Sequence, residues 1–364
     1  MFKKNHKKMR MLLAATVSFS SLFVIVGYVS AGGGTHIQEI TCDTRFGWYT
    51  KKSYKKEDFE RLKTLVQKYG EGGGYTVMYL INRAKKYCKK ESDGLMTWAE
   101  MDEKGFALSS AVHEETHAFT GSAKYDMLGK HISKRGNTIA FEVPNGGISS
   151  FYLDGWGIHH LFRTKYYDSK KMTAILPAKK FKGLRYDTYI VGGEYSVSRQ
   201  FGIYGLLNEY HAYYHGNKIN HGMNEDGVYK DLSNAYTAFP EFTLFILKYM
   251  QFAKKRYPAI YKTMMKEKET LETFIRIHDK FEPIFCDLAL SKNEFDKSIY
   301  NYKNIGETTY KGRSCSVTLK MYETTDTKKT YYTNSKDMEN YLIELQTPEM
   351  VSMLKEMRQA SGVK

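Results

Sequence analysis

The stretch His113-Glu114-Glu115-Thr116-His117 decides how this sequence is interpreted. Two histidines four positions apart lie on one face of a helix, about one turn from each other, so both imidazoles can reach one metal ion. Glu114 projects to the side of that face, where its carboxylate can take a proton from a water beside the metal. The pentad therefore predicts a zinc ion bound by His113 and His117, with Glu114 as the general base.

The residues around the pentad favour a helix over positions 106–119, with one packed face. Leu108, Val112 and Phe119 fall on one side of this helix, so the neighbouring histidine face can look into a cleft. The alternative without a metal is a pair of solvated histidines on a surface helix. Glu114-x-x-His117 also matches half of a di-iron carboxylate site, but no second unit of this kind is evident in the sequence.

A third protein ligand is needed, because catalytic zinc usually has three such ligands and one water. Residues 206–215 predict a second helix, with Glu209 at the edge of its apolar face. A carboxylate at that position needs a partner to offset its desolvation, and a metal ion would provide one. The alternative is a rim carboxylate that pairs with a lysine, an arginine or a tyrosine hydroxyl. Other possible third ligands are Asp126, His131, Asp154, His159, His160 and Glu194.

A second histidine pair, His211 and His215, has the same spacing on the second predicted helix. These histidines lie opposite Tyr210 and Tyr214, so we expect them to be exposed or at the rim of a cleft. A histidine or tyrosine here could hydrogen-bond the tetrahedral intermediate of peptide hydrolysis. We assign this role to His211 and Tyr213, with the neighbouring Tyr210 and His215 left open.

These two motifs resemble those of the zincin superfamily of metallopeptidases, in particular its glutamate-zincin branch. In that branch a glutamate on a later helix completes the zinc site, and Asn208-Glu209-x-x-Ala212 is similar to its second motif. The resemblance implies a zincin-like catalytic core, one zinc ion bound by His113, His117 and Glu209, and Glu114 as the general base. It covers only the two helices, and 91 residues separate His117 from Glu209, so the intervening segment would be an inserted subdomain.

The fold class that we expect is α+β, with an active-site helix, a small sheet or insertion, and a mainly helical C-terminal half. Helical spacing of apolar residues predicts helices over residues 55–69, 106–119, 200–215, 240–280 with a break near Pro258, and 338–358. Runs of β-branched and aromatic residues at 138–143 and 189–191 predict a small sheet with loops within 131–193. Residues 75–87 fit either a strand or a helix, and residues 291–334 look loop-like.

The first 31 residues are typical of a secretory signal peptide. Residues 2–10 carry five positive charges and no acid, an apolar run follows, and Val29-Ser30-Ala31 suits cleavage. Cleavage near Ala31 would leave 333 of the 364 residues and lower the net charge from +15 to +10. The apolar run of 19 residues could instead remain as an N-terminal membrane anchor. We interpret the remaining basic residues as a solvated surface, with an anionic cell-envelope surface as a possible partner, and no nucleic-acid motif accompanies them.

Export affects the interpretation of Cys42, Cys88, Cys286 and Cys315, because an even set of cysteines in an oxidising compartment predicts two disulfides. Four cysteines allow three pairings, and proximity favours Cys42–Cys88 and Cys286–Cys315. A cysteine zinc site is the alternative, but the sequence has no Cys-x-x-Cys spacing.

The sequence divides into a signal peptide (1–31), a zincin-like catalytic region (32–240, with an insertion at about 120–200) and a helical C-terminal region (241–364). It predicts a secreted zinc-dependent metallopeptidase that acts on a peptide or protein substrate. The alternative is an exported cell-surface binding protein with a structural or degenerate zinc site and no hydrolase activity. The oligomeric state stays open.

Overall fold

A computed structural model describes the following residues of the 364-residue chain: 36–41, 56–88, 107–128, 132–135, 138–143, 147–163, 166–181, 184–193, 196–228, 234–299, 302–324 and 336–364. The predicted signal peptide and Cys42 lie outside these residues, so the cleavage near Ala31 and the Cys42–Cys88 pairing stay predictions. In the described part of the chain, no helix is both long enough and apolar enough to cross a membrane.

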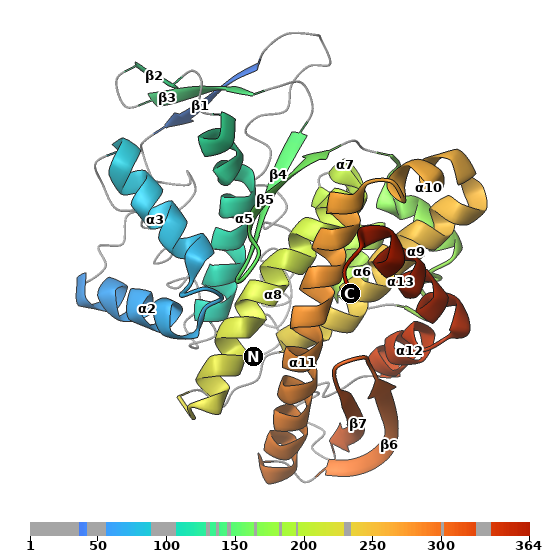
Figure 1. The fold of residues 1–364 in the computed structure, drawn as a ribbon. Helices are drawn as coiled ribbons and strands as arrows, with labels where there is room; N and C mark the ends of the chain where they lie inside the picture. Colours follow the sequence, from blue (N-terminus) through green and yellow to red (C-terminus); the bar gives the residue numbers. More distant parts are fainter. Residues whose placement is uncertain are drawn as a thin grey trace, which may run out of the picture.

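Two long helices form the centre of the molecule (Figure 1). Helix α5 (Ala107–Leu128) carries the histidine pentad and packs against α8 (Ile203–Glu225). Their backbones approach closely at Gly216, where a Cβ atom would lie 2.8 Å from the carbonyl oxygen of Ser109 and 3.5 Å from the Cβ of His113. Both helices were predicted, and both extend beyond the predicted C-terminal ends.

Helices α2 (Lys56–Tyr69) and α3 (Tyr75–Cys88) pack on one side of this central pair. The segment that fitted either a strand or a helix is therefore helical. Val77 and Ile81, four residues apart, are both fully buried in a small core with Phe59 of α2, Leu108 of α5 and Ile219 of α8. Helical spacing is what places both apolar side chains on this one face.

The C-terminal half is mainly helical, as predicted. Its helices are α9 (Ala238–Arg256), α10 (Pro258–Met264), α11 (Lys268–Ile299), α12 (Lys336–Leu345) and α13 (Pro348–Ser361). The predicted break at Pro258 is confirmed. The single final helix expected over 338–358 is wrong, because Pro348 begins a new helix that Thr347 caps through the backbone N–H of Met350.

The strands form three small antiparallel sheets. Strands β1 (His36–Thr41), β3 (Thr138–Val143) and β2 (Ile132–Arg135) make one sheet in that order, β4 (Gly147–Leu153) pairs with β5 (Gly157–Arg163), and β6 (Tyr302–Lys311) pairs with β7 (Ser316–Thr324). The predicted strand at 138–143 is confirmed as β3. Two expectations are wrong: residues 189–191 belong to a π-helical turn, η2 (Asp187–Val191), and the segment expected to be loop-like contains the β6–β7 hairpin.

Short helical turns lie between β5 and α8 and between α8 and α9. They are η1 (Ser169–Ala174), α6 (Leu184–Tyr186), α7 (Val197–Phe201) and η3 (Asn234–Thr237). Helix α8 lies between two cores, the small one with α2, α3 and α5 and a larger one with α9, α11, α12 and α13. The two cores explain why α8 is buried on nearly every face.

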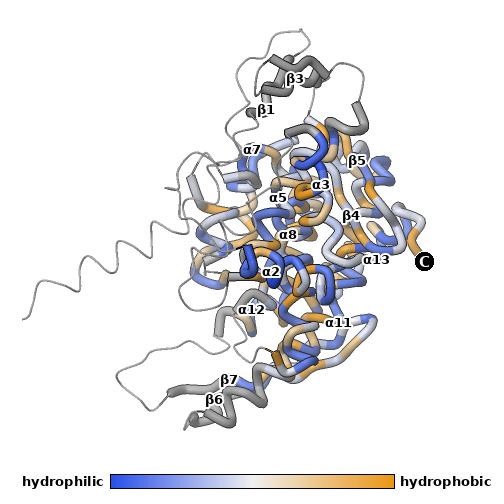
Figure 2. The backbone as a smooth tube through the Cα atoms, turned by 90° about the vertical axis from the view of Figure 1, so that its left-hand side faces the viewer, coloured by the Kyte–Doolittle hydropathy of each residue, from blue (hydrophilic) through white to orange (hydrophobic). Residues whose placement is uncertain are grey.

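Hydrophobic and hydrophilic residues alternate along α11 in Figure 2, as in an amphipathic helix.

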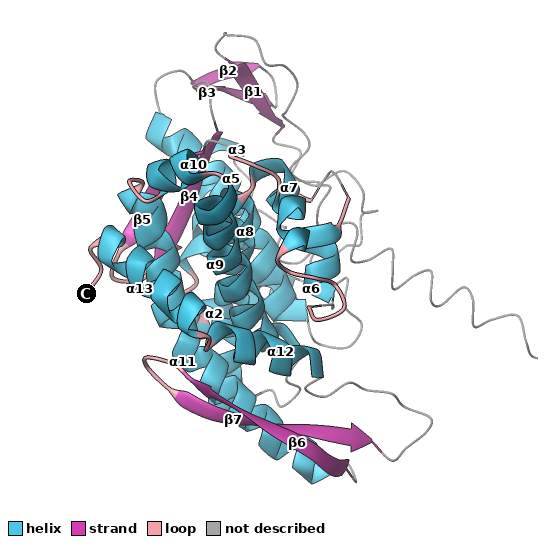
Figure 3. Ribbon diagram, turned by 90° about the vertical axis from the view of Figure 1, so that its right-hand side faces the viewer, coloured by secondary structure: helices cyan, strands magenta, loops and turns pink. Residues whose placement is uncertain are grey.

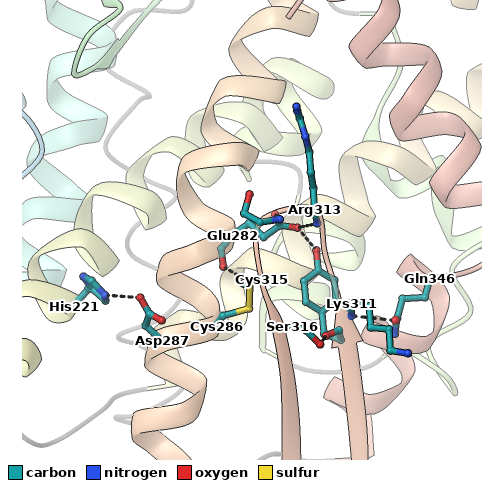
Figure 4. Close-up of a disulfide and its surroundings, with 11 residues drawn as sticks. His221, Glu282, Cys286, Asp287, Lys311, Arg313, Cys315, Ser316 and Gln346 are labelled. Carbon is teal, nitrogen blue, oxygen red and sulfur yellow. Dashed lines mark hydrogen bonds and ion pairs between the residues drawn. A yellow bond between two sulfur atoms is a disulfide. The ribbon is translucent and has the colours of Figure 1, made fainter. Parts of the chain in front are cut away.

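The disulfide Cys286–Cys315 joins α11 to the turn of the β6–β7 hairpin (Figure 4), and it confirms one of the two predicted pairings. The hairpin lies beside α11 at one end of the helical body (Figure 3). Beside the disulfide, Glu282 of α11 accepts hydrogen bonds from the backbone N–H groups of Arg313 (3.1 Å) and Ser314 (2.7 Å) in the turn. The described residues are mostly helical with small sheets, in agreement with a broad α+β class.

Candidate metal centre

Two elements bring three possible ligands together. Helix α5 supplies His113 and His117, and α8 supplies Glu209. The Nε2 atoms of the histidines are 3.0 Å apart, and Oε2 of Glu209 lies 3.7 Å from the first and 3.3 Å from the second. Ligand atoms on a tetrahedral zinc ion with bonds of about 2.0–2.1 Å lie about 3.3–3.4 Å apart. The three separations bracket that value, so this group could hold a metal ion.

The carboxylate of Glu209 is buried beside the two histidines. Its side chain is 5 % exposed, and Oε2 lies 3.3 Å from Nε2 of His117. A buried carboxylate is costly unless a positive charge offsets its lost hydration. A cation placed between Oε2 and the two Nε2 atoms would offset that cost. The donor set, two imidazoles and one carboxylate, also suits zinc.

The pKa values of the two histidines are shifted in opposite directions. Burial lowers the pKa of His117, but the carboxylates of Glu209 and Glu114 outweigh burial and raise this pKa to about 9. Burial and the positive charge of His117 hold the pKa of His113 well below its usual range. The metal-free centre therefore keeps a proton on His117, facing Glu209. A metal ion must displace this proton, so metal affinity falls as the pH falls.

Glu114 lies beside the three possible ligands and is not one of them. Burial raises its pKa to about 7, with the charge of His117 opposing and that of Glu209 reinforcing the shift. A carboxyl group with a pKa near neutrality can both accept and return a proton at physiological pH. This position and protonation behaviour are those expected of a general base.

Asn208 contacts the centre in a way that the sequence reasoning missed. Its Oδ1 lies 3.2 Å from Nδ1 of His117, so the ring can donate to the amide and keep Nε2 directed at the metal position. Two consecutive residues of α8, Asn208 and Glu209, therefore act on the same helix α5. The sequence signal for this contact was the Asn208-Glu209 pair of the second motif. The sequence analysis took only the ligand role of Glu209 from that pair.

His211 and His215 are 0 % and 1 % exposed, so the expectation that they are exposed or at a cleft rim is wrong. Strand β4 covers their face of α8. Each Nε2 lies 3.0 Å from the carbonyl oxygen of Tyr152, and the N–H of Tyr152 donates to Nε2 of His211 at 3.2 Å. This histidine pair therefore binds the backbone of β4.

Tyr213 borders the metal centre. Its ring centroid is 4.3 Å from that of His113, and its hydroxyl is hydrogen-bonded to Tyr189 and to Arg185. Tyr189 and Arg185 are further residues that the sequence reasoning missed. They belong to η2 and α6, and no local motif in the sequence connects these turns to Glu209.

Of the rival third ligands, the three that the structure describes are not part of the group. His159 stacks on Trp156 with ring centroids 3.5 Å apart, and Nδ1 of His160 lies 2.8 Å from Oγ of Ser150. Asp154 is in the turn between β4 and β5, where its backbone N–H donates to Glu71. His131, Glu194 and the side chain of Asp126 lie outside what the structure describes.

Comparison of the chain with models of protein families, with curated proteins and with solved structures found no match. The resemblance to zincins therefore rests on the two sequence motifs. The possible metal centre rests on its own geometry, which is independent of any relative.

Proposed function

We propose that this protein is an exported zinc-dependent metallopeptidase that hydrolyses peptide bonds with a zinc-activated water. The observation that carries the proposal is the convergence of His113, His117 and Glu209 next to a glutamate that is not a ligand. The described residues supply three protein ligands, which leaves a fourth position for water, whereas structural zinc sites usually have four protein ligands. The fourth position and Glu114 together favour a catalytic over a structural centre.

Each residue of the centre has a distinct part in this reaction. A bound zinc ion would supply the positive charge that polarises the substrate carbonyl and lowers the pKa of water. Glu114 takes the proton of the attacking water and passes it to the leaving nitrogen. His113, His117 and Glu209 hold the ion, and Asn208 keeps the His117 ring in its orientation.

The residue that would stabilise the developing oxyanion was predicted to be His211 or Tyr213. Nε2 of His211 contacts the Tyr152 peptide, whereas the Tyr213 ring packs against the His113 ring. Tyr213 is therefore the one of the two that borders the centre. Both assignments stay predictions, and Tyr213 would have to give up its hydrogen bond to Tyr189 in order to donate to the oxyanion.

Export is the second part of the proposal. The basic and apolar segment at residues 1–31 supports it, and the Cys286–Cys315 disulfide is compatible with an oxidising compartment. The net charge of +10 that remains after cleavage near Ala31 fits association with an anionic cell-envelope surface.

The first prediction tests the catalytic function. We expect the purified protein to contain about one zinc ion per chain, as measured by mass spectrometry of the metal content. Glu114→Gln should keep the zinc and lose hydrolysis of a peptide library by at least a factor of about 100, because the water loses its proton acceptor. His117→Ala should lose the zinc as well.

Two results would contradict this function. If wild-type protein is refolded in the presence of zinc and still contains none, the metal centre is excluded. If Glu114→Gln keeps full activity, Glu114 is excluded as the base. Bound zinc with no cleavage of any library peptide would instead support the alternative, an exported binding protein with a structural or degenerate site.

A further inference from the structure

We propose that Tyr189 is a positioning residue that fixes the carboxylate of Glu209, and that Tyr213 and Arg185 hold Tyr189 in place for this. The inference rests on the proposed function only in taking Glu209 as a metal ligand. It concerns the arrangement of the ligand side chains and the metal affinity that follows from this arrangement.

The four residues form one chain of hydrogen bonds. The hydroxyl of Tyr189 is bonded to the carboxylate of Glu209 and to the hydroxyl of Tyr213, which in turn is bonded to Arg185. A guanidinium can only donate and an ionised carboxylate can only accept, so the chain has a single direction. Arg185 donates to Tyr213, Tyr213 donates to Tyr189, and Tyr189 donates to Glu209.

This direction has a consequence for the carboxylate. Oε2 of Glu209 is the oxygen that faces the two histidines, at 3.7 Å from Nε2 of His113 and 3.3 Å from Nε2 of His117. A donor held at the carboxylate by other residues prevents the group from rotating about its last bond. The Tyr189 hydroxyl therefore keeps Oε2 directed at the metal position before a metal arrives.

Tyr189 is itself held firmly. Its carbonyl oxygen accepts hydrogen bonds from the hydroxyls of two fully buried serines, Ser169 at 2.9 Å and Ser198 at 2.5 Å. Its ring packs on Phe242 with centroids 5.2 Å apart, and the Tyr213 ring packs on the same phenylalanine at 5.4 Å. The π-helical turn of η2 presents the tyrosine between these contacts, and such turns are frequent at functional sites.

Arg185, at the other end of this series of hydrogen bonds, is held in place as well. Arg185 donates to Glu241 Oε2 at 2.5 Å and to Thr237 Oγ1 at 2.7 Å, and its guanidinium lies 4.5 Å from the centroid of the Tyr213 ring. The ion pair is buried, so its geometry is not loosened by water. Residues of α6 and α9 thus support Tyr213 and, through it, the tyrosine of η2 that contacts the Glu209 carboxylate.

The second prediction tests this series of hydrogen bonds through its effect on zinc affinity. The affinity is measured by competition with a chelator at a fixed pH. We expect Tyr189→Phe to weaken zinc binding by about 10- to 100-fold, as is typical when a residue that orients a metal ligand is lost. Tyr213→Phe should weaken it less. The double variant should be no weaker than Tyr189→Phe, because Tyr213 acts only through Tyr189.

Tyr210→Phe is the matched control. Tyr210 follows Glu209 in α8 and is fully buried, and its hydroxyl is bonded to Thr243 at 2.9 Å, away from the metal centre. This variant should keep wild-type zinc affinity. Tyr189→Phe with bound Co²⁺ should also show a shifted visible spectrum, which Tyr210→Phe should not, because only the former alters the ligand geometry.

The outcomes separate the two proposals. Wild-type protein that binds no zinc would contradict the proposed function. Zinc-binding wild type with equal affinities for Tyr189→Phe and Tyr210→Phe would overturn the inference alone, and additive losses in the double variant would overturn the order of the chain. If Tyr189→Phe does not fold, Tyr213→Phe decides: wild-type zinc affinity in this folded variant would overturn the inference.

Discussion

Two histidine pairs of identical spacing lie on the central helices, and the third atom beside each pair decides what it binds. In both pairs the Nε2 atoms are 3.0 Å apart. At the α5 pair the third atom is a carboxylate oxygen of Glu209, which attracts a cation. At the α8 pair it is the carbonyl oxygen of Tyr152, and the N–H of the same residue occupies the lone pair of His211. The second pair therefore has no free lone pair on His211 to give to a metal.

The third prediction concerns His215 of the second pair. His215→Ala removes the donor to the buried carbonyl of Tyr152, so we expect the free energy of unfolding to fall by about 1–3 kcal/mol. Zinc content should not change, because His215 is not one of the possible ligands. Urea unfolding of the metal-free protein and metal analysis measure the two effects. Loss of zinc in the folded variant would show that the α8 pair contributes to the centre after all.

At the scale of elements, the crossing of α5 and α8 builds the candidate site. Ninety-one residues separate His117 from Glu209 in the sequence, and only the close approach of the two helices joins them. Gly216 permits this approach because it has no Cβ to meet the Ser109 carbonyl. It also faces the Cβ of His113, so the distance between the helices sets the distance between the ligands.

The fourth prediction concerns this crossing. In Gly216→Ala the new methyl group forces α5 and α8 apart, because a Cβ atom there would lie 2.8 Å from a backbone oxygen. We expect a loss of about 1–3 kcal/mol in the free energy of unfolding, which is typical of overpacking, together with weaker zinc binding. Calorimetry and chelator competition measure these changes.

Gly121→Ala on α5 provides the control for that substitution. A Cβ at Gly121 would meet no atom within 4 Å, so the change should be neutral or should stabilise the helix by up to about 1 kcal/mol. Equal effects of the two substitutions would contradict the role of the crossing.

At the scale of the whole molecule, α11 joins the parts of the C-terminal half. It packs against α8 and α13, and the disulfide and Glu282 attach the β6–β7 hairpin to it. Asp279 of α11 accepts two hydrogen bonds from Arg358 of α13, one of them at 2.7 Å. This pair attaches the last helix of the chain to the helical body.

The fifth prediction is a dependence of stability on acid. Burial raises the pKa of Asp279, but the hydrogen bonds from Arg358 and His278 outweigh burial, so the pKa lies below its ordinary value. A lowered pKa contributes stability above the pKa of the unfolded chain, about 3.9 for aspartate, and this contribution is lost as the pH falls below about 4. Urea unfolding of the wild type at pH 7, 4 and 3 should show this loss. Asp279→Asn should be less stable at pH 7 and show a smaller loss on acidification, and an unchanged pH profile would contradict the assignment.

The sequence alone predicted the features that are local in the chain. Helical spacing gave the positions of α2, α5, α8 and the α9–α10 break, and the pentad with Glu209 identified the group that could hold a metal. Proximity of cysteines identified the Cys286–Cys315 pair. The helices and the pentad depend on residues within a few turns of one another, so periodicity and spacing are sufficient to find them. Glu209 was found instead from its place at the edge of an apolar helix face and from the resemblance of its motif to the second zincin motif.

Only the tertiary structure decided which faces are covered and which side chains meet across the chain. Strand β4 covers the α8 face that carries His211 and His215, and the pairing of β6 with β7 forms a hairpin in a segment of weak pattern. Tyr189 reaches Glu209 because two buried serines and Phe242 hold a π-helical turn beside α8. Such contacts join elements that are far apart in sequence, and their stability comes from burial and hydrogen bonds that no local pattern records.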